Sequence, residues 1–191
     1  MKKHFLSIAR LKAKFKIGGK ETTRFLGIRV DGDKASITRK LIKKGFRPKT
    51  HSIPGALAGC FNDMNVEIHI ITNYEKVWRL AITLAETDDI NNLRNTFNNL
   101  CDQFAENPRY ITKNGSDFRI DNDVDIIHEM NDYHRRFEAV FYQKPYNTQY
   151  PESIEKTLMR PVWFMIKKIY DHFCICIYYD NEYNRSNGSD L

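Results

Sequence analysis

One stretch decides the expected fold: Val66-Glu-Ile-His-Ile-Ile-Thr-Asn-Tyr-Glu-Lys-Val-Trp-Arg-Leu-Ala-Ile-Thr-Leu84. Apolar and polar residues alternate in both halves of this stretch, and a period of two is typical of a strand with one buried face. Between the halves, Asn73-Tyr-Glu-Lys76 favours a turn. With a further strand at 56–61, the stretch predicts a three-stranded antiparallel meander that buries one face.

The residues that follow predict an amphipathic helix. Its apolar positions have helical spacing and form one stripe: Ile90, Leu93, Phe97, Leu100, Cys101 and Phe104. We expect Thr87 or Asp88 to cap this helix, and Asn107-Pro108 to end it. We expect the stripe to pack on the strand residues Trp78, Leu80 and Ile82.

The rest of the chain predicts a similar order of elements. Asp33 is a candidate N-cap for a helix over 34–44, and Gly45 stands where a left-handed residue ends it. Later strands are expected at 135–143, 162–169 and 173–179, with a helical turn at 153–158 and a polar tail from 180 to 191.

This order, helix and three strands taken twice, predicts the fold class α+β with helices packed on one face of one or two antiparallel sheets. Val77-Trp-Arg-Leu-Ala-Ile82 and Val162-Trp-Phe-Met-Ile166 look alike, which suggests a weak internal repeat. We expect one α+β domain over 25–191, with half-repeats at about 25–108 and 109–191.

Composition excludes several classes of protein. The chain has 191 residues, of which 41% are hydrophobic and 28% charged, so a globular fold is expected rather than disorder. No apolar run approaches the roughly 20 residues of a membrane span. Four cysteines are too few for a disulfide-stapled scaffold.

The charge is uneven along the chain. Residues 1–50 hold 16 basic and three acidic residues, whereas the whole chain has a net charge of +6. Residues 1–24 are expected to form a basic arm or an edge strand. Their apolar stretch is too short for a signal peptide, so the sequence as written predicts a cytoplasmic location.

The basic segment provides one hypothesis for function. Nucleic-acid or anionic-surface binding through residues 1–49 would place lysines on phosphate groups. The candidate residues are Lys12, Lys14, Lys16, Lys40, Lys43 and Lys44.

No motif predicts a metal, a cofactor or a catalytic centre. Asp121, Asp123 and Asp125 have the first spacings of a calcium loop, but Ile126 and Asp132 stand where such a loop needs Gly and Glu. Cys174 and Cys176 read as buried thiols within a strand. An acid–base pair of Glu67 and His69 is the weaker alternative to an ordinary exposed sheet face. An enzyme of unrecognised type remains open, and phosphate-binding and nucleophile motifs are missing from the sequence.

Tyrosines in loops support the hypothesis that we favour, a non-enzymatic module that binds a protein or peptide. Tyr146 and Tyr150 lie in a proline-containing excursion, and exposed loop tyrosines mark interaction surfaces. A sheet edge left exposed would be a second way to hold a peptide.

Several segments resemble a known group of proteins. They include Phe25-Leu-Gly-Ile-Arg-Val-Asp-Gly32, Arg136-Phe-Glu-Ala-Val-Phe-Tyr-Gln143, Val162-Trp-Phe-Met-Ile166 and the tail from Tyr179 to Leu191. Over about 25–191, the chain is similar to a family of uncharacterised proteins common in Bacteroidales gut bacteria. The resemblance implies no activity and no site residues. Members of the family often begin with a hydrophobic leader, whereas the corresponding stretch here is basic.

Overall fold

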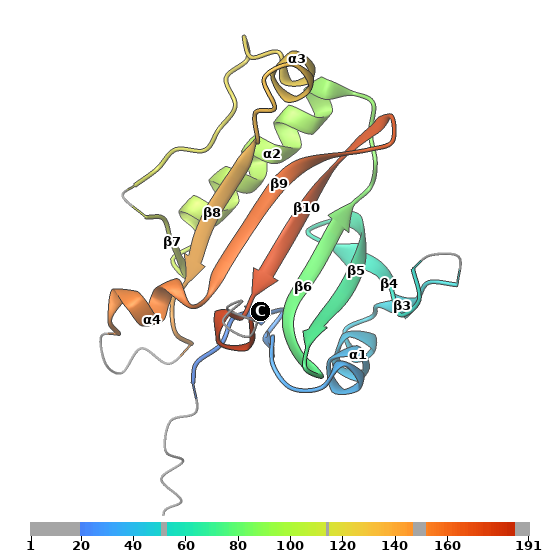
Figure 1. Ribbon diagram of the computed structural model, residues 1–191, viewed down its shortest axis with the longest axis vertical. Coiled ribbons are helices and arrows are strands. Elements are labelled where there is room, and N and C mark those ends of the chain that lie inside the picture. The colour runs from blue at the N-terminus through green and yellow to red at the C-terminus, as the bar shows by residue number, and fades with distance from the viewer. Residues whose placement is uncertain (1–19, 51–52, 114, 147–151, 186–191) are drawn as a thin grey trace, which may run out of the picture.

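The computed structural model describes residues 20–50, 53–113, 115–146 and 152–185. Their fold is mixed α+β, with four α-helices, a two-stranded antiparallel sheet and an eight-stranded antiparallel sheet among these residues (Figure 1). The helices are α1 (Lys34–Lys43), α2 (Ile90–Glu106), α3 (Ile126–Asn131) and α4 (Ile154–Leu158), with a 3₁₀ turn η1 (Glu182–Asn184). The strands are β1 (Arg24–Phe25), β2 (Ile28–Arg29), β3 (Arg47–Pro48), β4 (Leu57–Phe61), β5 (Met64–Asn73), β6 (Lys76–Leu84), β7 (Tyr110–Ile111), β8 (Glu138–Gln143), β9 (Pro161–Ile169) and β10 (His172–Asp180).

The large sheet has the strand order β3-β4-β5-β6-β10-β9-β8-β7. Every neighbouring pair is antiparallel, and β6 pairs with β10 at the centre although the two strands are about 100 residues apart in sequence. Both edge strands, β3 and β7, are two residues long. The long strands β6, β10 and β9 therefore form the middle of the sheet (Figure 1).

The two main helices begin and end at residues that suit helix termini. Asp33 accepts a hydrogen bond from the Ser36 amide at the start of α1, and Gly45 follows this helix with a φ of 100°. Asp89 caps α2 by accepting from the amides of Asn91 and Asn92. The cap residue of α2 is therefore Asp89 and not Thr87 or Asp88, because its carboxylate lies directly before the first helical residue.

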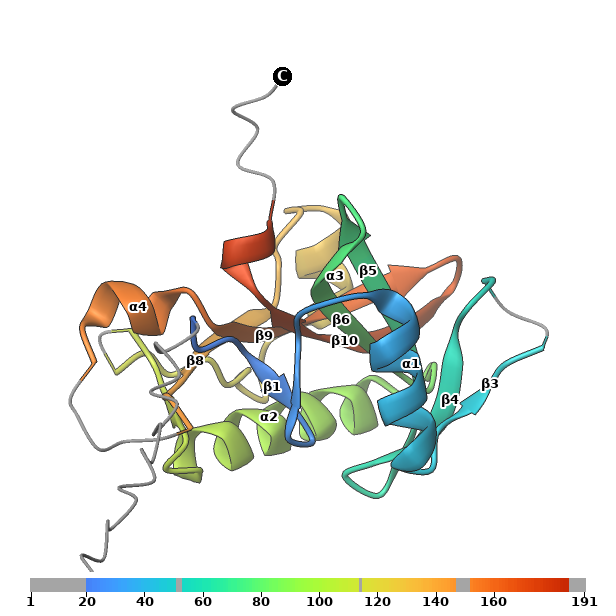
Figure 2. The ribbon, with the colours of Figure 1, turned by 90° about the horizontal axis from the view of Figure 1, so that it is seen from below.

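One face of the sheet is covered by α1 and α2, and we call it the covered face (Figure 2). Side chains of both helices share one hydrophobic cluster with alternate residues of β5, β6, β8, β9 and β10. Phe97 and Phe104 of α2 contact Phe164 of β9, with ring centroids 5.0 and 5.7 Å apart. Burial of large side chains is worth about 1.5–3 kcal/mol each before chain entropy is counted, so this cluster is the main source of stability.

The predicted place of Trp78 is wrong. Val77, Leu80 and Ile82 are buried in the cluster of the covered face, whereas Trp78 is half-buried outside it. The register between β5 and β6 shifts between Ile71 and Thr72, and such a bulge adds one residue on one strand. The alternation of buried and exposed side chains along β6 is therefore interrupted at Trp78, beside this bulge.

The predicted polar tail is also wrong at its start. Asp180 is the last residue of β10 and is 1% exposed, and Asn181 is fully buried. The Asn181 side chain donates to the carbonyl of Val30 at 2.8 Å, and Asn184 donates to Asp31 and to the carbonyl of Val77. The chain after β10 thus packs against the segment that leads into α1.

A buried arginine joins three segments at one end of the sheet. Arg160 is 1% exposed, and its guanidinium forms an ion pair with Glu152. It also donates to the carbonyls of Gln143, at 2.8 Å, and Glu21, at 3.4 Å. The guanidinium therefore holds the segment before α4, the end of β8 and the start of the described chain together, and Thr22 and Thr23 beside Glu21 are buried.

No helix among the described residues has the length and apolar character required to cross a membrane.

Candidate functional site

The face of the sheet opposite α1 and α2 presents a row of aromatic and charged side chains, and we call it the open face. The strand register places Arg79 of β6 opposite Asp180 of β10, and Tyr178 of β10 opposite Trp163 of β9. The small cluster on this face contains Tyr178, Trp163 and Met165, and no residue of the described helices belongs to it.

Asp180 is the polar centre of the open face. Its carboxylate accepts two hydrogen bonds from the Arg79 guanidinium, both at 2.7 Å, and a third from the Trp163 indole at 2.9 Å. The Arg79 side chain is 17% exposed. A buried carboxylate needs such partners because an unpaired charge would lose its hydration without compensation.

Aromatic rings surround the Arg79 guanidinium. Its central carbon lies 4.3 Å from the ring centre of Trp78, 4.6 Å from that of Tyr178 and 5.3 Å from that of Trp163. Trp163 and Tyr178 stack on each other with centroids 4.3 Å apart. Cation–π contacts and the two parallel hydrogen bonds to the Asp180 carboxylate hold Arg79 in one orientation.

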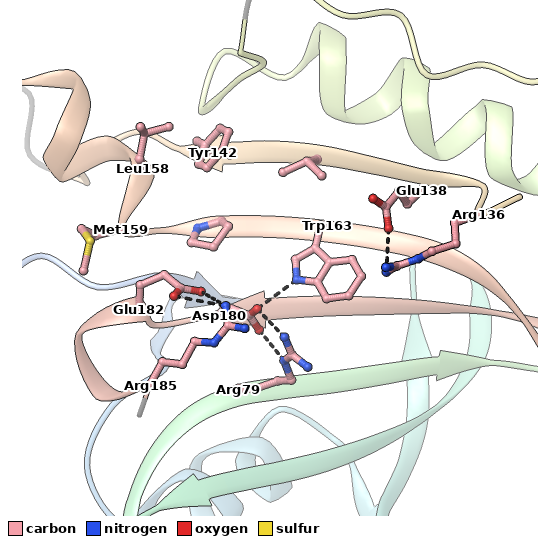
Figure 3. A pocket seen from close by; sticks show the side chains of 12 residues that line it. Arg79, Arg136, Glu138, Tyr142, Leu158, Met159, Trp163, Asp180, Glu182 and Arg185 are labelled. Atoms are coloured by element: carbon pink, nitrogen blue, oxygen red, sulfur yellow. Dashed lines mark hydrogen bonds and ion pairs between the residues drawn. The ribbon is translucent and has the colours of Figure 1, made fainter. Parts of the chain in front are cut away.

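A cavity of about 710 Å³ opens beside this cluster, and we call it the first cavity (Figure 3). Tyr142, Met159 and Trp163 give it apolar walls. Its arginines are paired with carboxylates that also line it: Arg79 with Asp180, Arg136 with Glu138, and Arg185 with Glu182. The wall therefore combines both charges with aromatic surface and carries little net charge.

A thiol pair lies further along β10 on the open face. The sulfur atoms of Cys174 and Cys176 are 3.8 Å apart, and both side chains are buried. The hydrogen bond between the two thiols lowers the pKa of Cys176, and the nearby Thr83 hydroxyl and Lys167 ammonium add to the effect, whereas burial opposes it. The same hydrogen bond raises the pKa of Cys174, and burial adds to this rise. The prediction that these two thiols are buried is confirmed.

A second cavity, of about 350 Å³, lies between the β1–β2 turn and the C-terminal half of α2. Phe61, Leu100 and Phe104 form its apolar wall, and Arg24 and Arg109 line it as well. It opens on the covered side of the sheet, because Tyr179 lines it while the next residue, Asp180, lines the first cavity.

Of the two predicted site tyrosines, the structure describes Tyr146. Tyr146 is 56% exposed and lies 4.6 Å from the Arg24 guanidinium and 4.7 Å from that of Arg109, so it borders the second cavity. Tyr146 is not among the residues that line the first cavity. Tyr150 lies outside the described residues.

The structure describes three of the six predicted lysines. Lys40, Lys43 and Lys44 are exposed on or directly after α1 and form no ion pair with a described residue. Lys12, Lys14 and Lys16 lie outside the described residues.

Three of the side chains considered for chemistry, Asp125, Glu67 and His69, have structural partners. Asp125 caps α3 by accepting from the His128 amide at 3.0 Å. His69 Nε2 lies 2.9 Å from Glu67 Oε1, and Lys49 also pairs with Glu67. Within the described ranges, no group of three or more His, Cys, Asp and Glu side chains is placed to hold a metal ion.

Sequence reasoning missed the Arg79–Trp163–Asp180 cluster. One signal for Asp180 was present: Cys174, Cys176, Tyr178 and Asp180 continue a single period of two, which places them on one face of one strand. The partner residue Arg79 carried no such signal, because the pairing of β6 with β10 cannot be read from either strand alone.

The chain was compared with protein-family models, curated proteins and solved structures, and none of them matches it.

Proposed function

We propose that the chain is a non-enzymatic module that binds a peptide segment of a partner protein on the open face of its sheet. The observation that supports this most is the wall of the first cavity. It combines Trp163, Tyr142 and Met159 with arginines, the residue types that are enriched at protein interfaces and at their energetic hot spots. Its volume of about 710 Å³ is large enough for two or three side chains of a ligand.

The charges of the cavity favour a particular kind of peptide. Each arginine of the wall has a carboxylate partner, so a strongly acidic or basic ligand would have to break existing ion pairs. We therefore propose a segment of low net charge with apolar side chains. The face is proposed rather than an edge, because the cavity with its aromatic wall lies on the face, and the edge strands β3 and β7 are only two residues long.

Selection of peptides against the full chain tests this proposal. A displayed library of random peptides is enriched on the protein, and the dissociation constants of synthetic peptides are then measured by calorimetry. We expect peptides of low net charge, with affinities that change little between 50 and 300 mM salt because few phosphate-like or carboxylate contacts are involved.

Two variants locate the binding surface. Tyr142→Ala and Met159→Ala each remove a half-buried side chain from the wall of the first cavity, and each should weaken binding at least fivefold. Tyr170→Ala is the matched control, because Tyr170 is 92% exposed at the β9–β10 turn and lines none of the cavities described above. Equal loss in the control, no loss in the two wall variants, or a failure to enrich any peptide would refute the proposal.

The basic side of α1 supports a second candidate, binding to nucleic acid or another anionic surface. The helix contains Lys34, Arg39, Lys40 and Lys43 and no acidic residue, and Lys44 follows it. Gel shifts at low salt with duplex and single-stranded DNA would test it. The triple variant K40Q/K43Q/K44Q should bind more weakly and show a smaller salt dependence, whereas K113Q/K144Q/K156Q, which changes three exposed lysines elsewhere, should not.

We also propose that residues 25–191 form one domain built from two half-repeats. A single hydrophobic cluster with members from Phe25 to Tyr179 supports one domain. The strands β4, β5 and β6 fill one half of the sheet and β8, β9 and β10 the other, which supports the repeat. The two look-alike segments fall on β6 and β9, the third strand of one set and the second of the other, so they do not occupy equivalent positions.

A further inference from the structure

The second cavity differs from the first in its charge. Arg24 and Arg109 line it, and no aspartate or glutamate does. The Arg24 Nε atom is 3.1 Å from Glu21, which lies outside the lining. Arg109 has no ion pair with a described residue, and its guanidinium contacts the ring of Tyr146. Two guanidinium groups and one neighbouring carboxylate leave a net charge of about +1 at this cavity.

The remaining lining supplies an apolar wall and four side-chain amides, those of Asn62, Gln103, Asn107 and Gln143. Phe61, Leu100 and Phe104 belong to the hydrophobic cluster of the covered face or pack against it. At the rim, the Asn62 amide donates to the Gln103 side-chain oxygen at 2.7 Å. Apolar walls with a small number of placed polar groups are typical of sites for small ligands, and a volume of about 350 Å³ is within their range.

We propose that the second cavity binds a small amphipathic carboxylate, a molecule with one carboxylate group on an apolar body. The guanidinium of Arg109 can receive the carboxylate through two parallel hydrogen bonds, while the apolar body displaces water from Phe61, Leu100 and Phe104. The site lies on the other side of the sheet from the open face, so this proposal is independent of peptide binding there.

The end of α2 favours a monoanion over a dianion. Asn107, the C-cap of α2, lines the cavity, and the carbonyl end of a helix carries about half a negative charge. A second negative charge on the ligand would meet this end and exceed the net charge of the two arginines and Glu21. The ring of Tyr146 keeps both guanidinium groups beside the cavity through contacts of 4.6 and 4.7 Å.

The test uses 3-phenylpropionate and its neutral amide, 3-phenylpropionamide, as probes of the full chain. Binding is followed by chemical-shift changes in the amide NMR spectrum and by calorimetry. We expect 3-phenylpropionate to saturate with a dissociation constant of about 1 mM or lower, and the amide to bind at least tenfold more weakly, since it lacks the charge that Arg109 receives.

Three variants separate the site from other causes of binding. Arg109→Gln should weaken binding of the carboxylate about tenfold without changing the weak binding of the amide. Gln103→Trp fills the cavity from an exposed position of α2 and should abolish binding of both probes while both arginines remain. Arg39→Gln, an exposed arginine of α1 that does not line the cavity, is the matched control and should bind as the parent chain does.

The thermal midpoint of each variant shows that it is folded before binding is measured. No saturable binding of 3-phenylpropionate up to about 10 mM would overturn the proposal. It would also be overturned by equal binding of the amide and the acid, or by a loss in Arg39→Gln as large as that in Arg109→Gln. A shift of peaks confined to residues outside the second cavity would overturn it as well.

Discussion

The covered and open faces of the sheet are both buried along β10, but they are built from different residues. On the covered side, Phe173, Ile175, Ile177 and Tyr179 alternate along the strand and pack beneath helices. On the open side stand Cys174, Cys176, Tyr178 and Asp180, which are equally buried without a covering helix. Neighbouring side chains of the sheet itself, Trp163 and Met165 among them, pack against this row.

The difference shows that burial has two sources in this protein. Helices bury the covered face through apolar contact, and that burial depends on the shape and volume of large side chains. On the open face, ion pairs, a stacked pair of rings and hydrogen bonds hold the side chains in place. On the open face, fixed and buried side chains of β10 therefore lie beside half-buried ones, such as Trp163 and Met165, that reach solvent.

The largest expected difference in stability is between two adjacent residues of β9, one on each face of the sheet. Phe164 is fully buried on the covered face, whereas Met165 is half-buried on the open face. Phe164→Ala should lower the free energy of unfolding by about 3–5 kcal/mol, because it leaves a cavity beneath α2. Met165→Ala should lower it by about 1 kcal/mol or less, since part of the side chain is already in water. Urea denaturation measures both, and similar losses would mean that the two faces contribute equally.

The next effect concerns the polar centre of the open face. Asp180→Ala removes the partner of Arg79 and of the Trp163 indole, and should cost about 2–4 kcal/mol of unfolding free energy. Glu138→Ala is the control on the same face, because Glu138 is exposed and forms its ion pair with Arg136 at the surface. That control should cost less than about 0.5 kcal/mol. A loss of the same size in both variants would show that Asp180 contributes no more to the free energy of unfolding than the exposed Glu138.

A smaller effect is expected at the start of the covering helix. Asp89→Ala removes the carboxylate that accepts from two amides of α2, and should cost about 1 kcal/mol. The Asn variant at the same position should retain most of the stability, since its side-chain oxygen can accept the same bonds. Thermal unfolding of the two variants compares them directly, and equal losses would show that the cap hydrogen bonds do not stabilise α2.

The smallest effect depends on pH and concerns a contact between the start of β10 and the segment before α2. His172, at the start of β10, lies with Nδ1 2.7 Å from Asp88, just before α2. The hydrogen bond and the charge of Asp88 raise the pKa of His172 above its ordinary value of 6.5. The contact therefore stabilises the fold fully below pH 6.5, and this contribution is lost as the pH rises through the raised pKa.

An NMR titration of the His172 ring checks the direction. In Asp88→Asn the pKa of His172 should return toward its ordinary value, and the loss of stability above pH 6.5 should disappear. A titration curve that is unchanged in this variant would assign the raised pKa to another cause.

Local features of the fold could be predicted from the sequence, and the pairing of distant segments could not. The first helix, its Asp33 cap and the left-handed Gly45 follow from a single continuous segment of the sequence. The stripe from Leu93 to Phe104 is buried as its helical spacing predicts.

The errors lie where long-range contacts override local patterns. Trp78 follows the alternation of β6 in sequence, but the irregular register with β5 places it outside the cluster of the covered face. Asp180 reads as the first residue of a polar tail, and its burial depends on Arg79, which is 101 residues away. The second cavity joins β1, β4, α2 and β10, so neither its shape nor its charge could follow from any one segment.

The two-residue strands at the ends of the eight-stranded sheet have a consequence for behaviour at high concentration. Each edge leaves few backbone groups free to pair with another molecule, and β3 ends in a proline, which has no amide hydrogen to donate. Pairing of one sheet edge with the edge of another molecule, a step toward fibrillar aggregates, is therefore disfavoured along β3 and β7 themselves. Long storage at high concentration should leave the protein free of amyloid-like material.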